Sequence, residues 1–174
     1  MKSKIAICGL LIAGCIGSAN ANKTDFYAGI TGGIGGQSYF ADGDNSSKSA
    51  TAYGAMFGID VPLVRAELEY NRFDTKEFAT NATMANMYFK LMPSPVVSPY
   101  VGIGAGLQFG GKVKEFDADT KNNWAAQAMA GLTFGIPATS LFIDTEIRAM
   151  YLPEIATKVD AVHYDFRLKA RYAF

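Results

Sequence analysis

The last thirteen residues of the chain alternate between apolar and polar side chains. One face would carry Val162, Tyr164, Phe166, Leu168, Ala170, Tyr172 and Phe174, and the other His163, Asp165, Arg167, Lys169, Arg171 and Ala173. Successive side chains of a strand point to opposite faces, so this period predicts a β-strand with one apolar and one charged face. An apolar face against lipid and one against a protein core look alike locally, and the rest of the chain must decide between them.

Seven segments upstream repeat this alternation. Together the eight segments lie at residues 26–34, 53–61, 64–70, 85–91, 101–109, 124–136, 141–151 and 162–174. They are about ten residues long, which is the length that a tilted strand needs to cross a bilayer. No stretch after residue 21 offers the roughly 20 consecutive apolar residues of a membrane-spanning helix. The pattern therefore predicts an all-β fold.

The connections between these segments alternate between long and short. The long, polar ones are residues 36–50, 73–82, 110–122 and 152–160, and the short ones lie near Pro62 and at residues 93–98 and 137–140. Four long loops then share one end, as in membrane barrels with short periplasmic turns and longer extracellular loops. A sheet in hydrocarbon cannot leave an edge unpaired. We therefore predict an eight-stranded antiparallel up-and-down transmembrane β-barrel.

The first 21 residues have the features of a secretory signal peptide, with two lysines, an apolar stretch and a small-x-small site ending at Ala21. Residues 22–174 would then form the barrel domain. A second interpretation is a lipobox, in which Cys15 is lipid-modified and anchors the chain. Both cysteines, Cys8 and Cys15, lie within this segment. The predicted mature chain therefore has no disulfide and no thiolate metal site.

The predicted polar faces carry six basic and six acidic side chains. They are Arg65, Lys90, Arg148, Arg167, Lys169 and Arg171, and Asp60, Glu67, Glu69, Asp144, Glu146 and Asp165. Inside a membrane barrel each buried charge needs a partner. We therefore expect an interior charge network in which Arg167, Lys169 and Arg171 pair with acids of other strands, namely Glu67, Glu69, Asp144 or Glu146.

The interior of an eight-stranded barrel is just filled by side chains, which argues against a wide aqueous pore. Gly102, Gly104 and Gly106 fall on the predicted inner face. They either make room for the long Arg and Glu side chains opposite them or relieve curvature at kinks of the barrel.

Three short motifs resemble the small bacterial outer-membrane β-barrel family, the porin-superfamily group that includes OmpA-, OmpX- and opacity-type barrels. They are Phe26-Tyr27-Ala28-Gly29, the run PYVGIGAG at residues 99–106, and the terminal Phe174. The resemblance implies an integral protein of the bacterial outer membrane, in contact with its lipid and lipopolysaccharide. Because the chain stops at Phe174, we expect it to lack the separate peptidoglycan-binding domain that the larger OmpA-type proteins carry.

In that family a terminal Phe preceded by aromatic or apolar residues at alternate positions acts as a signal for the barrel-assembly machinery. The resemblance assigns this role to Tyr164, Phe166, Leu168, Tyr172 and Phe174, with Ala170 as a weaker member.

Little in the sequence suggests catalysis or metal binding. The lone histidine, His163, is expected to be a polar residue at the barrel rim, because Asp165 occupies the position where a serine nucleophile would have been informative. Asp42 and Asp44 have calcium-loop spacing, but the required glycine and distal glutamate are missing. We therefore expect no enzymatic activity, no catalytic or metal site and no cofactor.

The architecture suggests a structural or adhesin-like role at the cell surface, exerted through four extracellular loops by a monomer that binds no nucleic acid. Tyr39, Phe40, Asp42, Val113 and Phe116 place apolar residues among charges in these loops, which fits either an extracellular protein partner or packing between loops. Two alternatives are a narrow porin-like channel and a soluble lipocalin-like carrier with its apolar face inward.

Overall fold

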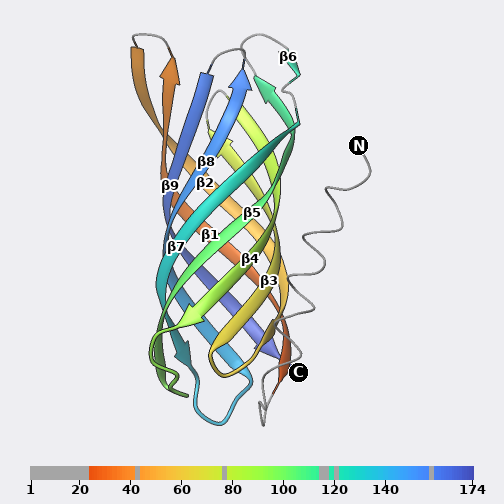
Figure 1. The fold of residues 1–174 in the computed structure, drawn as a ribbon, viewed down its shortest axis with the longest axis vertical. Helices are drawn as coiled ribbons and strands as arrows, with labels where there is room; N and C mark the ends of the chain where they lie inside the picture. Colours follow the sequence, from red (N-terminus) through yellow and green to blue (C-terminus); the bar gives the residue numbers. More distant parts are fainter. Residues whose placement is uncertain (1–23, 42–43, 76–77, 114–117, 120–121, 157–158) are drawn as a thin grey trace.

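The structure is a computed structural model that describes residues 24–41, 44–75, 78–113, 118–119, 122–156 and 159–174. It contains nine strands (Figure 1): β1 Asp25–Ala41, β2 Asp44–Asp60, β3 Val64–Thr75, β4 Phe78–Lys90, β5 Val97–Val113, β6 Ala118–Asp119, β7 Asn123–Gly135, β8 Leu141–Ala156 and β9 Val159–Ala173. Eight of them are long, and the two-residue β6 only extends the hairpin of β5. None of these residues forms a helix that could cross a membrane.

The eight long strands close into a barrel. Each pairs antiparallel with its neighbours in sequence, and β1 pairs with β9 from Tyr27↔Ala173 to Phe40↔Asp160. Closure leaves no long strand with an unpaired edge in the apolar zone, as hydrocarbon requires. The predicted eight-stranded antiparallel up-and-down barrel is confirmed.

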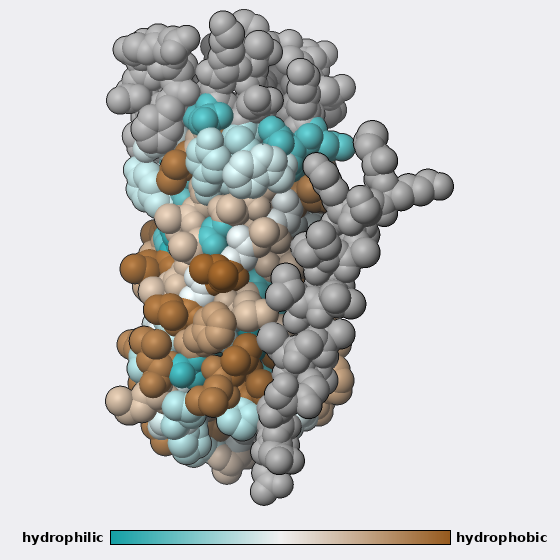
Figure 2. All heavy atoms as spheres, viewed as in Figure 1, coloured by the Kyte–Doolittle hydropathy of each residue, from teal (hydrophilic) through white to brown (hydrophobic). Residues whose placement is uncertain are grey.

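The alternation sorts side chains between the two faces of the wall. Apolar side chains point outward, with Ile30 67% and Ile103 63% exposed, whereas Glu69 and Lys169 on the inner face are 0% exposed. Figure 2 shows the resulting brown apolar surface along the lower and middle part of the barrel. The lipocalin-like alternative, with its apolar face inward, is therefore wrong.

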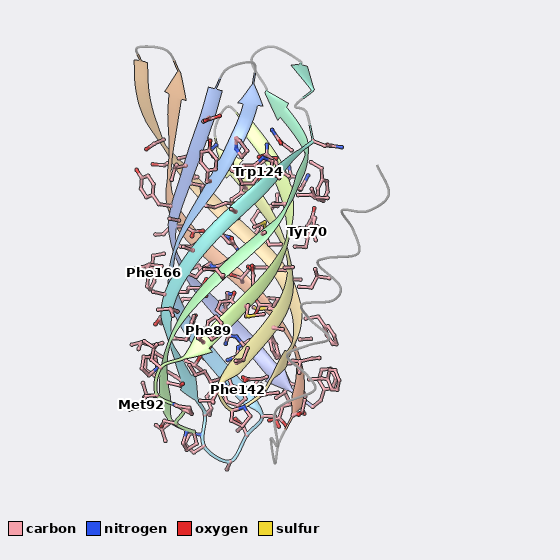
Figure 3. All side chains as sticks on the ribbon, viewed as in Figure 1. Tyr70, Phe89, Met92, Trp124, Phe142 and Phe166 are labelled. Carbon is pink, nitrogen blue, oxygen red and sulfur yellow. The ribbon has the colours of Figure 1, made fainter. Side chains whose placement is uncertain are left out.

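Aromatic side chains mark the two ends of this apolar belt (Figure 3). Tyr70 and Trp124 lie near the end opposite the C-terminus, which we call the outward end. Phe89 lies near the end that holds the C-terminus. Such rings gather at the two membrane–water interfaces of a transmembrane barrel. The belt between them is the part of the barrel that lies in the membrane.

The turns at the C-terminal end are short, as expected. Val61 N donates to Val64 O at 3.0 Å, and Ile136 N donates to Leu141 O at 3.0 Å. The second turn places Ala138 at a φ of 61°, in the left-handed region. The strands continue past the aromatic girdle at the opposite end, and membrane barrels keep their short connections on the periplasmic side, so this end is assigned to the periplasm.

The segments predicted as long loops are mostly strand, which corrects the prediction. Residues 36–41 and 44–50 continue the paired strands β1 and β2 up to Ala41↔Asp44. Likewise β3 runs to Thr75, β4 starts at Phe78, and β8 and β9 pair up to Ala156↔Val159. Beyond the lipid both faces of a strand are wet, so the apolar period disappears although the pairing continues.

Three predictions concern residues that the structure does not describe. The signal peptide at residues 1–21, with Cys15, lies outside the described residues, as do Asp42 and Phe116. Tyr39, Phe40 and Val113 have described backbone only, in β1 and β5.

Candidate functional site

The barrel interior is filled by a layered set of paired charges, which we call the interior network. In its middle layer Arg167 of β9 lies between Glu69 of β3 and Glu146 of β8. Arg167 Nη1 donates to Glu69 Oε1 at 2.5 Å, and Arg167 Nε donates to Glu146 Oε1 at 2.5 Å. All three side chains are at most 1% exposed. One cation thus joins acids from two other strands across the barrel.

Lys169 extends the same layer along β9. Its Nζ lies 2.9 Å from Glu67 Oε1 and 3.4 Å from Glu146 Oε2, and it also contacts Tyr88 Oη at 2.8 Å. Glu67 accepts three further hydrogen bonds, from the hydroxyls of Tyr27 and Tyr88, both at 2.8 Å, and from Asn86 Nδ2 at 3.2 Å. A buried carboxylate with this many donors has its hydrogen-bonding capacity met.

The layer of the interior network nearest the periplasmic end is built around Asp144. This carboxylate accepts hydrogen bonds from Arg171 Nε at 2.8 Å and Nη2 at 3.0 Å, and from Arg65 Nη1 at 3.0 Å. The guanidinium of Arg65 also lies 4.1 Å from the ring centroid of Tyr88. Lys90 pairs with Asp60 at the periplasmic mouth, where both side chains are partly exposed.

The outward layer combines one ion pair with an apolar cluster. Arg148 pairs with Asp165, and His163 Nε2 lies 3.2 Å from Asp165 Oδ2. The His163 ring packs edge-on against Phe73 with centroids 4.7 Å apart. The buried apolar cluster here comprises Ala52, Phe73, Ala82, Met84, Ala125, Met150, Leu152 and Ala161.

His163 is 0% exposed, so its prediction as a polar rim residue is wrong. The strand continues outward beyond it, and the residue lies within the barrel.

The structure therefore brings all twelve charges of the predicted polar faces onto the inner face, in three layers. The basic side chains are Arg65, Lys90, Arg148, Arg167, Lys169 and Arg171, and the acidic ones are Asp60, Glu67, Glu69, Asp144, Glu146 and Asp165. Sequence reasoning did not assign Tyr27, Tyr88, Tyr100 and Asn86 to this network, although each hydrogen-bonds one of its carboxylates. Their phase in the alternation could have identified them, because they share the inner face with the charged residues of their own or neighbouring strands.

Gly102 and Gly104 make room for side chains of the neighbouring strand β4, whereas a Cβ at Gly106 would overlap the backbone oxygen of Thr83. A Cβ at Gly102 would overlap the ring of Tyr88, and one at Gly104 would overlap the amide oxygen of Asn86. We expected Arg and Glu side chains in this space, and that expectation is wrong. Gly102 and Gly104 accommodate two of the hydrogen-bonding partners of Glu67.

We expect Gly102→Ala to lower the free energy of unfolding by about 1–3 kcal/mol, because the new methyl group overpacks against Tyr88. The measurement is urea unfolding in detergent, followed by the heat-modifiable mobility of the barrel on gels. Gly32→Ala is the matched control, since nothing lies within 4 Å of a Cβ built there, and we expect a change within about 0.5 kcal/mol. Equal losses in the two variants would contradict the packing role of Gly102.

The residues of the predicted assembly signal lie on the outer face of β9, except Phe174, which directly follows the strand. Tyr164, Phe166, Leu168, Tyr172 and Phe174 are between 46% and 66% exposed. The ring of Phe174 lies 6.5 Å from that of Phe57, and its backbone N donates to Phe26 O at 2.9 Å. The last residue thus lies at the seam where β9 meets β1.

A shallow apolar groove of about 650 Å³ crosses the outer face between β1, β7, β8 and β9. Its lining includes Ile34, Ala128, Ala130, Ala149 and Phe166. It opens to the lipid side of the wall.

Comparisons with known proteins agree with this architecture. Residues 6–174 match the family model of the outer membrane protein β-barrel domain. No curated protein matches the chain. Among solved structures, Neisserial surface protein A is similar at 14% identity and a TM-score of 0.65, covering 88% of this chain and 100% of its own.

Two further structures are similar in fold. The N-terminal β-barrel domain of Pseudomonas aeruginosa OprF has 18% identity and a TM-score of 0.56, covering 84% of this chain and 97% of its own. The attachment invasion locus protein Ail of Yersinia pestis, in complex with the heparin analogue sucrose octasulfate, has 15% identity and a TM-score of 0.51, covering 85% and 99%. With the family match spanning nearly the whole chain, the protein belongs to the outer membrane protein β-barrel domain family and is an integral barrel of the bacterial outer membrane.

Proposed function

We propose that this protein is a non-conducting outer-membrane barrel that acts as a structural and surface-contact protein through its outward strand extensions. The observation that carries the proposal is the filled interior. Arg167, Lys169 and Asp144 join strands across the barrel, with side chains at most 1% exposed. The apolar cluster around Phe73 and Met150 lies outward of these ion pairs. The burial of both layers supports an interior that is closed to a continuous water-filled path.

The outward extensions supply the contact surface. Among the described residues, those at 44–49 of β2 pair with β1 alone, because the described pairing of β2 with β3 ends at Ala50↔Thr75. The β1–β2 hairpin therefore rises beyond β3, as its orange and brown strands do at the upper left of Figure 1. Surface segments placed by a rigid scaffold are where binding functions concentrate.

The charge of these extensions favours a protein partner over a polyanion. Residues 36–50, 73–82, 110–122 and 152–160 contain nine acidic and six basic side chains. Ail was solved with a heparin analogue, which is a polyanion. An acidic excess on this chain opposes that ligand class.

We propose that the protein is not an enzyme and that β9 ends in an assembly signal for the barrel-assembly machinery.

Purified protein in planar bilayers is expected to give no reproducible unitary conductance. The barrel domain of a known porin, reconstituted in the same lipid, is the positive control. Reproducible single-channel steps from protein that retains heat-modifiable gel mobility would contradict the non-conducting proposal and favour the narrow channel.

The surface role is tested on cells that display the barrel. Binding is measured to surfaces coated with an extracellular-matrix extract and to surfaces coated with heparin. We expect retention on the protein surface, little retention on heparin, and a loss when residues 38–47 are replaced by an Asn-Gly turn. Retention that is unchanged by this shortening would contradict contact through the β1–β2 extension.

A further inference from the structure

The outward hairpin of β1 and β2 has one covered edge and one open edge. β1 pairs with β9 out to Phe40↔Asp160, so the β1 side of the hairpin is covered. On the β2 side, residues 44–49 have no described strand beside them, because the pairing with β3 ends at Ala50. Figure 1 shows this hairpin at the upper left, with β1 between β2 and β9. Backbone N–H and C=O groups on the open β2 edge can therefore pair with an added strand.

A second outward edge is protected against such pairing. Residues 152–156 of β8 extend beyond the described pairing with β7, which ends at Tyr151. Pro153 lies in this run and has no N–H, and its carbonyl accepts a hydrogen bond from Asn123 Nδ2 at 3.0 Å. The β8–β9 pairing is also irregular within this run. Residues 44–49 contain no proline and pair with β1 in an unbroken register. The β2 edge is thus regular and open where the β8 edge is blocked.

Only some registers are possible when two copies of the β2 edge meet. Neighbouring residues of a strand direct their N–H and C=O groups to opposite edges, so only alternate residues of β2 face the open edge. A symmetric antiparallel pair must place the edge-facing residues of the two copies opposite one another. One residue then lies on the two-fold axis, opposite its own copy. For most of residues 44–49 to pair, this residue must be Ser46 or Ser47.

The charges of the edge select one of these two registers. With Ser46 on the axis, Asp44 of each copy lies opposite Lys48 of the other, so two pairs of opposite charges form. With Ser47 on the axis, Lys48 lies opposite Ser46 and no opposite charges meet. A lysine on a strand edge normally discourages pairing, but here it selects a partner strand that carries an acid at that position. A second copy of this edge carries that acid.

The symmetry of this pairing determines where the second copy lies. The two-fold axis of an antiparallel strand pair is perpendicular to the sheet. In the wall of a barrel this direction is parallel to the membrane, so the rotation reverses the barrel axis of the second copy. Two barrels in one membrane point the same way and cannot pair through this edge. The second copy must lie in a facing membrane, while each barrel remains a monomer in its own.

We propose that residues 44–49 of β2 form a contact between cells, in which the β2 edges of two barrels in facing outer membranes pair as antiparallel strands. This inference rests on the proposed surface-contact function and names a second copy of this chain as the partner. The paired segment is short and buries little surface, so a single contact is weak. Many copies acting together hold the two cells.

The test uses cells with a truncated lipopolysaccharide that display the full barrel, and it measures how fast they settle from suspension. We expect wild-type cells to settle together. Asp44→Lys or Lys48→Asp alone should slow settling about tenfold, because like charges then meet in both pairs. The variant with both exchanges should settle as the wild type does. A mixture of the two single variants, each marked with a different fluorescent protein, should form two-coloured aggregates, because every pair between them again joins opposite charges.

Lys112→Asp is the matched control, because it makes the same charge change on the outward extension of β5 and should leave settling unchanged. All variants must show equal surface amounts and heat-modifiable mobility. The proposal is overturned if displayed wild-type barrels cause no settling, or if both single variants settle as fast as the wild type. It is also overturned if the variant with both exchanges settles but the mixture does not, since the charges would then act within one hairpin.

Retention on the matrix-coated surface is measured with the same cells. Retention without settling would overturn the self-pairing and leave the proposed surface role standing. Settling without retention would support the self-pairing and count against contact with matrix proteins.

Discussion

Replacing Arg167 by methionine is expected to lower the free energy of unfolding by about 3–5 kcal/mol, which is the range for removing one partner of a buried ion pair. The substitution leaves Glu69 without its main cation and takes from Glu146 one of its two. Both carboxylates are 0–1% exposed, so water cannot compensate them without opening the barrel. Urea unfolding in detergent or lipid vesicles, followed by gel mobility, measures the loss.

Two companion variants separate the ion pair from the packing of Arg167. Leu168→Met changes the next residue on β9, whose side chain faces lipid and is 51% exposed, and should cost less than about 1 kcal/mol. Adding Glu69→Gln to Arg167→Met should recover stability, because the unpaired charge is removed and Glu146 keeps Lys169 and the Tyr100 hydroxyl. A loss below about 1 kcal/mol for Arg167→Met alone would show that the interior network is not the core of the barrel.

The alternation predicted which face each membrane-spanning residue occupies, but it could not predict partners. Arg167 and Glu69 are 98 positions apart, and their pairing depends on the stagger of the strands around the barrel. The sequence pattern shows that an interior cation needs an acid, yet it carries no information on this stagger. The general set of interior charges was therefore predictable, and the individual contacts were not.

The outward ends were mispredicted for a different physical reason. Residues 36–50 are rich in Gly, Ser and Ala and have no apolar period, so they resembled a loop, although β1 and β2 pair along most of this stretch. Once both faces of a hairpin meet water, pairing no longer requires the alternation that identifies a strand. His163 was misplaced by the same reasoning, because β9 was taken to begin near it, whereas its pairing with β8 continues outward to Val159.

Ile103→Arg is expected to destabilise the folded barrel by about 2–4 kcal/mol in lipid vesicles, the cost of a cation near the bilayer midplane. Ile103 is 63% exposed on β5 and lies between Ala128 of β7 and Met87 of β4. Ile103 lies two positions outward of Val101, which pairs with Phe89 of the periplasmic girdle, and six positions before Phe109, which packs against Tyr70, so a guanidinium there lies within the apolar belt. The guanidinium cannot turn into the barrel interior, because Ile103 points outward. The space over the neighbouring inner positions, Gly102 and Gly104, is filled by Tyr88 and Asn86.

Ser49→Arg is the matched control on β2, four positions outward of Tyr53 on the same exposed face. A charge there lies beyond the girdle, and the expected cost is about 0–1 kcal/mol. Both variants are measured by urea titration of vesicle-reconstituted protein. In detergent micelles, which adapt their shape around a charge, the difference between the two variants should shrink. If Ile103→Arg and Ser49→Arg cost the same in vesicles, the apolar face of β5 is not in contact with the hydrocarbon core, and the depth assigned to the barrel from its aromatic girdles is wrong.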